Sequence, residues 1–306
     1  MAVQGPLTRD VVLVAFEEHL RRTRGVCPET RRYYSRCVNA FLVALFGDRP
    51  VEPALISVPD VVEFVSATTH RCQPGTTKLV ATSLRSFFRF LRAAGLREDR
   101  MEEAIPTVPR RRLTGLPRYL DGKQFAHLIA SLDSSSPRGL RDRAILLCVA
   151  RLGLRAGEVA RLQLDDVNWR NATIHVRTRK TGHGAHLPLP QDLGQALAAY
   201  LQEGRPRTQA RHVFVLHRQH VGAPIHRQVV ADAVRRALRH AGMEAPIHGS
   251  NLLRHSLATD LLRHGATMKE IADLFGHQSL ATTTIYAKVD VAALRDVALP
   301  WPQVTS

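Results

Sequence analysis

The sequence predicts a mainly α-helical fold in two domains, with a small antiparallel β-sheet in the C-terminal domain. Three observations predict it. Apolar residues recur at helical spacing over most of the first hundred residues, strand-forming residues cluster only between about 164 and 190, and a Pro- and Arg-rich segment, residues 98–117, separates the two parts. With 306 residues, of which 44% are hydrophobic, the chain can bury two separate cores.

The first domain, residues 1–97, is expected to be a compact helical bundle. Its first helix carries Phe16 and Leu20 on one face and ends before Gly25, and its last helix ends at Gly95. Four helices are expected, at residues 8–24, at 28–46, just after Pro59, and from 75 to about 94.

The second domain, residues 118–306, is expected to be helical around one β-hairpin. Asp121 and Gln124 form a plausible capping box for a helix to Leu132, and Thr267 and Glu270 form a second one. Strands at 173–177 and 186–189 flank a Gly-containing turn that begins near Lys180. Further helices are expected at 141–152, up to Leu162, and at 227–241, 250–264 and 267–275, before a tail that follows Tyr286.

The charge balance favours a nucleic-acid partner. Lys and Arg outnumber Asp and Glu by 43 to 27, which gives a net charge of +16, and the excess is spread over both halves. An Arg-rich composition without a nucleic-acid role is the alternative. The residues expected on the DNA backbone are Arg110, Arg111 and Arg112 of the linker, together with Lys78 and Arg85, although a solvated charged face would look the same.

Several classes of protein are disfavoured. The apolar runs are too short to span a bilayer, and the N-terminus lacks a signal-peptide pattern, so we expect a cytoplasmic, nucleoid-associated protein. The four cysteines lack metal-binding spacing and are expected to be reduced, small core residues. No histidine pair with a carboxylate predicts a metal site, and no cofactor is expected.

Individual residues suit phosphate chemistry. Arg155, steadied by Glu158 three residues later, can present a planar fork to phosphate oxygens, although a surface ion pair is the simpler interpretation. Lys180 can donate a proton from a hairpin turn, and Arg254 lies on a helix with Asn251 one turn earlier. His277 follows a glycine, and Tyr286 is a nucleophile if cations surround the atom that it attacks.

The order of these residues resembles the tyrosine recombinase (phage integrase-like) family. The resemblance includes Leu154-Arg-Ala-Gly-Glu-Val-Ala-Arg-Leu162, Leu253-Arg-His-Ser-Leu-Ala-Thr259 and Leu274-Phe-Gly-His-Gln-Ser-Leu-Ala-Thr-Thr-Thr-Ile-Tyr286, and it spans most of the chain. It implies a two-domain, C-shaped clamp around DNA and a homo-tetramer on an inverted-repeat site. It also implies that Tyr286 forms a 3′-phosphotyrosine link, that Arg155 and Arg254 brace the phosphate, that Lys180 protonates the leaving oxygen and that His277 bonds the phosphate.

One position departs from the family pattern. The family usually has His-x-x-Arg around the second arginine, where this chain has Asn251-Leu-Leu-Arg254. Asparagine donates a hydrogen bond but does not exchange a proton near neutral pH. We hypothesise that Asn251 only positions the phosphate, and that His248 or an unassisted tyrosine covers the loss of a base.

Three functions remain open at this point. The favoured one is a site-specific recombinase that integrates or transposes a mobile element or performs Xer-like dimer resolution, without metal or ATP. A DNA-binding protein of the same fold with impaired catalysis is the alternative that Asn251 favours. A type IB topoisomerase shares the tyrosine chemistry, but the two-domain layout and the short tail disfavour it.

Overall fold

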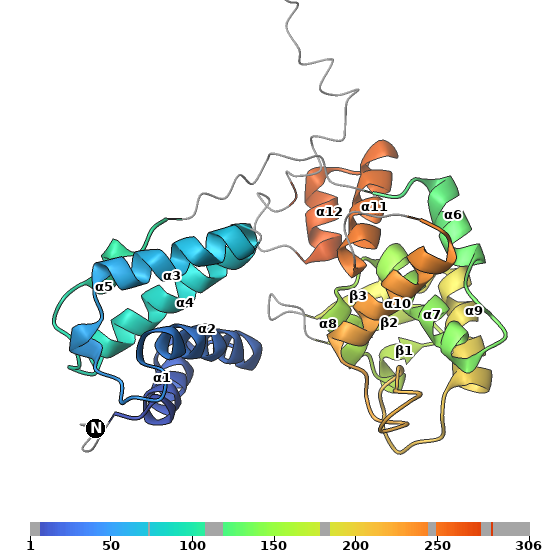
Figure 1. Ribbon diagram of the computed structural model, residues 1–306. Helices are drawn as coiled ribbons and strands as arrows, with labels where there is room; N and C mark the ends of the chain where they lie inside the picture. Colours follow the sequence, from blue (N-terminus) through green and yellow to red (C-terminus); the bar gives the residue numbers. More distant parts are fainter. Residues whose placement is uncertain are drawn as a thin grey trace, which may run out of the picture. The chain divides into compact units, whose positions relative to one another are not determined.

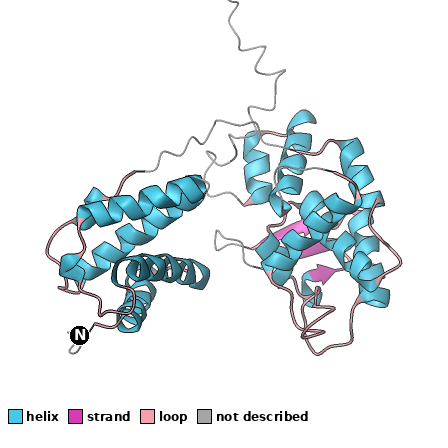
Figure 2. Ribbon diagram, in the orientation of Figure 1, coloured by secondary structure: helices cyan, strands magenta, loops and turns pink. Residues whose placement is uncertain are grey.

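The computed structural model describes residues 7–72, 74–107, 119–177, 184–243, 249–276 and Thr283. The chain divides into two compact units, Met1–Arg112 and Leu113–Ser306, each of which is described here by itself (Figure 1). Helices dominate both units and one small antiparallel sheet lies in the second, so the predicted fold class is confirmed (Figure 2). None of the helices in the described ranges is long and apolar enough to cross a membrane.

The first unit is a bundle of helices whose ends follow local capping rules. Thr8 accepts a hydrogen bond from the amide of Val11, and Gly25 ends the first helix in the left-handed conformation with φ 55°. Ser57 and Asp60 form a reciprocal capping box. The elements are α1 (Arg9–Arg24), α2 (Pro28–Phe46), the 3₁₀ turn η1 (Pro53–Leu55), α3 (Val58–Arg71), α4 (Pro74–Ala93) and α5 (Met101–Ala104).

Aromatic side chains fill the core of this bundle. Phe16 of α1 meets Phe87 of α4 edge to face, with ring centroids 5.5 Å apart, and Phe41 of α2 meets Phe88 of α4 at 6.2 Å. All four rings are buried. Such pairs join the three longest helices of the unit through contacts worth about 1 kcal/mol each beyond burial.

The core of the first unit extends past residue 97, into the segment predicted as linker. Met101 and Ile105 are buried with the aromatic cluster. Arg85 donates from Nη2 to the carbonyl oxygens of Ile105 and Pro106, at 2.8 and 3.0 Å, so this side chain fastens the end of α5 to α4. Lys78 is exposed. The expected DNA contacts of Lys78 and Arg85 stay predictions, and Arg110, Arg111 and Arg112 lie outside the described residues.

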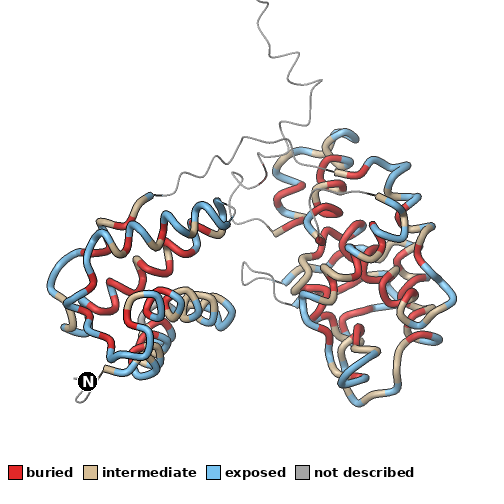
Figure 3. The backbone as a smooth tube through the Cα atoms, viewed as in Figure 1, coloured by how far each residue is buried: buried red, intermediate tan, exposed pale blue. Residues whose placement is uncertain are grey.

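The second unit is built around α7, most of whose residues are buried (Figure 3). This helix contacts α9, α10 and α11. The elements are α6 (Gly122–Ala130), α7 (Pro137–Leu152), α8 (Ala156–Arg161), the 3₁₀ turn η2 (Leu164–Asp166), β1 (Val167–Asn168), β2 (Thr173–Val176), β3 (Ala185–Pro188), α9 (Gln191–Ala199), the π-helical turn η3 (Tyr200–Gly204), α10 (Arg227–His240), α11 (Ser250–Arg263) and α12 (Met268–Phe275).

The sheet has the order β1-β2-β3 and is antiparallel throughout. Ile174 pairs with Leu187, and both face the core. His175 and His186 pair on the opposite face, where their rings stack with centroids 4.4 Å apart. The predicted hairpin is therefore present, and β1 adds a short third strand that the sequence pattern did not indicate.

Helix α5 lies in the segment predicted as linker, and two further helical features differ from the prediction. The helix expected from Arg141 begins at Pro137, because Ser136 accepts the amide of Gly139 at 3.1 Å and Pro fits the first helical position. Helix α9, which directly follows Pro190, was not predicted. Both predicted capping boxes, at Asp121 and Thr267, are confirmed.

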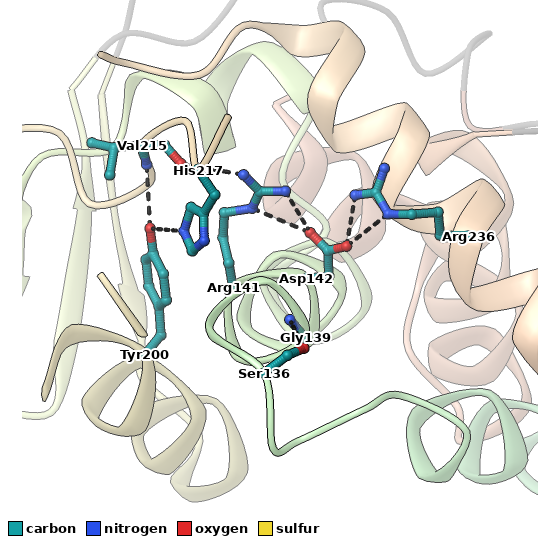
Figure 4. A network of polar contacts seen from close by, with 8 residues as sticks. All are labelled: Ser136, Gly139, Arg141, Asp142, Tyr200, Val215, His217 and Arg236. Carbon is teal, nitrogen blue, oxygen red and sulfur yellow. Dashed lines mark hydrogen bonds and ion pairs between the residues drawn. The ribbon is translucent and has the colours of Figure 1, made fainter. Parts of the chain in front are cut away.

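A buried ion network ties α7 to α10 and to the chain after η3 (Figure 4). One carboxylate oxygen of Asp142 accepts from Nε and Nη2 of Arg141, at 3.2 and 3.0 Å, and the other from Nε and Nη2 of Arg236, at 2.9 and 2.6 Å. The hydroxyl of Tyr200 accepts from the amide of Val215 at 3.3 Å. Arg141 and Asp142 both lie on α7, so the pair with Arg236 joins α7 to α10, and Nη1 of Arg141 joins α7 to the chain after η3 by donating to the carbonyl of Val215 at 3.3 Å.

The cysteines are free, as predicted, but two of the four are not core residues. Cys148 is buried in α7 and Cys37 is half-buried, whereas Cys27 and Cys72 are exposed at helix ends. Their positions as flanking residues of α2 and α3 explain the difference.

Candidate active site

Arg155 is held in place by Glu158. Gly153 ends α7 with φ 61°, and Arg155 then occupies the N-cap position of α8 in an extended conformation. The backbone amide of Arg155 donates to Glu158 Oε2 at 2.8 Å, and its Nη1 donates to Oε1 at 2.9 Å. The Glu158 side chain is 4% exposed and that of Arg155 27%. The pair is therefore not a surface ion pair; a buried carboxylate orients a guanidinium that solvent still reaches.

Arg155 also contacts the end of α12. Its Nη2 donates to the carbonyl oxygen of Gly276 at 3.1 Å, across 121 positions of sequence. Gly276 closes α12 in the left-handed conformation, with φ 55°. His277 is the next residue, so the contact joins Arg155 to the chain immediately before that predicted site residue.

Arg254 approaches the same end of α12 from α11. Its guanidinium carbon lies 4.4 Å from the centroid of the Phe275 ring, in a cation–π arrangement, and its side chain is buried. The ring of Phe275 also lies against Gly153, where a Cβ atom would be only 2.5 Å from Phe275 Cε1. Phe275 therefore needs the missing side chain at position 153, and it brings α7, α11 and α12 together.

The other side of α11 is fastened to the start of the second unit. Ser256 Oγ accepts from the backbone amide of Leu120 at 2.7 Å and donates to the carbonyl of Leu252 at 3.0 Å. Arg263 stacks on the ring of Tyr119, with its guanidinium carbon 4.9 Å from the centroid. The helix that carries Arg254 is thus held between α12 and residues 119–120.

The remaining groups near Arg254 differ in exposure. Asn251 lies in the first turn of α11 and is exposed. Burial, and then the positive charge of Arg254, lower the pKa of His255, so this imidazole is neutral at neutral pH. His255 is therefore a packing neighbour of Arg254 and adds no further cation at neutral pH.

The predicted site is described only in part. Arg155, Glu158, Arg254 and Asn251 lie in the described ranges, and the structure brings the two arginines to one helix end. Lys180, in the segment that joins β2 to β3, lies outside them, as do His248, His277 and Tyr286. Their roles stay predictions. Within those ranges no group of three His, Cys, Asp or Glu side chains could hold a metal ion.

Sequence reasoning missed the supporting residues Gly153 and Phe275. The only signal for them was local: a glycine just before Leu154-Arg155 and an aromatic residue just before Gly276-His277. Contact between residues 122 positions apart is not encoded in either segment alone.

The fold and the site together define a class. Two converging guanidinium groups, one oriented by a buried carboxylate, in a helical unit that follows a helical bundle, suit an enzyme that acts on a phosphodiester. Residues 118–292 match the phage integrase family, and residues 13–95 match the phage integrase N-terminal SAM-like domain.

Relatives point to the same family. The chain is 39% identical over 289 residues to a Sinorhizobium fredii protein with the provisional name integrase/recombinase y4rA, which covers 94% of this chain and 70% of that protein. It is 31% identical over 280 residues to the tyrosine recombinase XerD of Listeria innocua, and the match covers 90% of this chain and 92% of that protein. The chain belongs to the phage integrase family: it is a tyrosine recombinase, an enzyme that cleaves and rejoins DNA.

Solved structures share the fold at lower identity. The chain is similar to the XerH site-specific recombinase bound to palindromic difH substrate, with TM-score 0.70, 17% identity and 97% of each chain covered. It is equally similar to a lambda integrase dimer bound to a COC′ core site, with TM-score 0.70, 17% identity and coverage of 97% and 99%.

Proposed function

We propose that this recombinase cleaves DNA through Tyr286. The phenolic oxygen of Tyr286 gives its proton to His248 or, unassisted, to water and bonds to phosphorus, while the bond to the 5′ oxygen of the next nucleotide breaks and that oxygen takes a proton from Lys180. The products are a 3′-phosphotyrosine link and a free 5′-hydroxyl. Because the link conserves the energy of the phosphodiester, the 5′-hydroxyl of a partner strand reverses the step without ATP.

The convergence of Arg155 and Arg254 on the last residues of α12 is the observation that supports this proposal most strongly. An unperturbed tyrosine has a pKa near 10. Attack at pH 7 therefore depends on cations that stabilise the charge developing on the phosphate. Arg155 and Arg254 supply two such cations on the non-bridging oxygens, His277 adds a hydrogen bond, and Glu158 keeps Arg155 in position.

Asn251 takes the role of a positioning donor in this scheme. Its exposed place in the first turn of α11, three residues before Arg254, suits a hydrogen bond to the phosphate. The same substitution favours a second candidate function, namely specific DNA binding with impaired cleavage, because the usual proton acceptor is missing.

Recombination requires several subunits and a defined site. We propose a homo-tetramer on a site with inverted repeats, at the nucleoid, that integrates or transposes a mobile element or resolves dimers in the manner of Xer proteins. The relatives' names support both roles, and one structural neighbour is a lambda integrase tetramer bound to a Holliday junction.

Covalent capture tests the proposal. Wild-type protein and the Tyr286→Phe variant are each mixed with fragmented host DNA in EDTA, and SDS-resistant adducts are recovered and sequenced. An adduct that requires Tyr286, forms without metal and maps to recurrent inverted repeats is the expected result. Salt-sensitive DNA binding without any adduct would contradict the proposal and favour the non-cleaving candidate.

A further inference from the structure

A polar pocket opens beside the site, and Glu158, the carboxylate that holds Arg155, is one of its lining residues. It has a volume of about 200 Å³ and lies between α8, β2 and residue 212. Its polar side chains are Glu158, Arg161, Gln163, Asp166, His175, Arg177 and His212. A water molecule occupies about 30 Å³ of liquid volume. The pocket therefore has room for a phosphate group together with several waters.

Both carboxylates of the pocket are already engaged. Glu158 bonds Arg155 through both oxygens. Asp166 accepts from Arg177 Nε through one oxygen and from the amide of Gln163, at 2.8 Å, through the other. Each acid thus has an arginine partner, and the nearby exposed Asp165 is paired with Arg211.

Arg161 is the surplus cation of the pocket. It makes no hydrogen bond or ion pair with any residue in the described part of the chain, and its Nη1 would be 3.4 Å from a Cβ atom at Gly157. The guanidinium therefore lies back along α8 toward the turn that begins at Arg155. His175 and His212 add ring nitrogens that can donate to an anion.

We propose that this pocket binds a second phosphodiester of the DNA strand that enters the active site, with Arg161 as its main cation. The proposal rests on the proposed function, because Glu158 forms a wall of the pocket and also holds Arg155. Because both sites share Glu158, a phosphate bound here lies next to the one that meets Arg155. The strand is then bound at two phosphates, one by Arg155 and one by Arg161, which fixes its position before Tyr286 attacks.

The salt dependence of DNA binding tests the pocket without knowledge of the target site. Each phosphate that a protein neutralises contributes about 0.9 to the slope of log K against log salt concentration. Affinity for a duplex of arbitrary sequence is measured by fluorescence anisotropy across a series of NaCl concentrations. The Arg161→Gln variant is expected to reduce the slope by about 0.9, and Arg161→Lys to restore most of it.

The Arg211→Gln variant is the matched control. Arg211 has a side chain that is 62% exposed, immediately precedes His212 and does not line the pocket. Its slope and its Tyr286 adduct are expected to equal those of the wild type. An unchanged slope for Arg161→Gln, or an equal decrease in slope for Arg161→Gln and Arg211→Gln, would overturn the proposal that the pocket binds a phosphate. Failure of the wild type to form an adduct would overturn the proposed function instead, while the slopes still decide on the pocket.

Discussion

Gly153→Ala is expected to damage both the stability and the chemistry of the enzyme, because the position combines a left-handed backbone with a missing side chain against Phe275. At φ +61° the alanine costs about 1 kcal/mol of backbone strain. Its Cβ would lie 2.5 and 2.8 Å from two ring carbons of Phe275, and overpacking of this kind costs about 1–3 kcal/mol. The sum, about 2–4 kcal/mol, corresponds to a Tm lower by roughly 10 °C for a unit of this size.

The same clash displaces the ring on which Arg254 stacks and the helix end that Arg155 contacts. A misplacement of about 1 Å can cost about 100-fold in rate. We therefore expect the Tyr286 adduct to form about 100-fold more slowly, when measured in single-turnover assays well below the Tm of the variant.

Gly242→Ala separates backbone strain from contact with Phe275. Gly242 has φ +62°, but a Cβ atom there meets nothing within 4 Å among the described residues. This variant is expected to lose about 1 kcal/mol and no activity. If Gly153→Ala and Gly242→Ala lower the Tm and the rate equally, the idea that a side chain at position 153 displaces the arginines through Phe275 is refuted.

Three further outcomes follow from the site and the core. Glu158→Gln removes a buried charged partner of Arg155 and should lower the free energy of urea unfolding by about 2–3 kcal/mol. As a control, Asp192→Asn breaks an exposed ion pair with Arg151 and should lower it by under about 1 kcal/mol. Similar losses for the two variants would contradict a special role for Glu158. Asn251→His should speed adduct formation at least about tenfold if a proton acceptor is missing, and an unchanged or slower rate would remove that idea. His217 should make the fold acid-sensitive: burial, then the charge of Arg141, lowers its pKa from 6.5 to about 4, so the unfolded chain takes up a proton first as the pH falls. The contribution of neutral His217 to the free energy of unfolding is fully present above pH 6.5 and is lost, by at most about 3 kcal/mol, as the pH falls toward 4. In urea titrations at a series of pH values, the His217→Gln variant should show a smaller decline.

Local signals in the sequence predicted the helices and the hairpin well. A capping box such as that of Asp121 and Gln124 is a contact between residues three apart, so the pattern and the structure carry the same information. Helix α9 escaped prediction because Pro188 and Pro190 resemble loop residues, although Pro190 serves as its N-cap. The start of α7 was placed too late because its first residues, Pro137 to Leu140, lack an apolar stripe and its entry depends on Ser136.

The sequence proposed a set of site residues but not their arrangement in space. Arg155 and Glu158 three positions apart are compatible with a surface pair, and only the packing of α8 makes the carboxylate buried. The contacts of Arg155 with Gly276 and of Arg254 with Phe275 depend on how α8, α11 and α12 meet in space. Motif order predicted which residues take part, whereas long-range packing determined which of the described ones touch.

The contacts of Tyr119 and Leu120 determine where a hybrid enzyme can be joined. These two residues precede the first helix of the second unit, yet one is stacked under Arg263 and the other donates to Ser256, so they belong with α11. A chimera that takes its N-terminal unit from a relative therefore needs its junction before residue 119. A junction after residue 120 would replace both contacts and loosen the helix of Arg254, so the hybrid would lose cleavage even with a correctly folded borrowed unit.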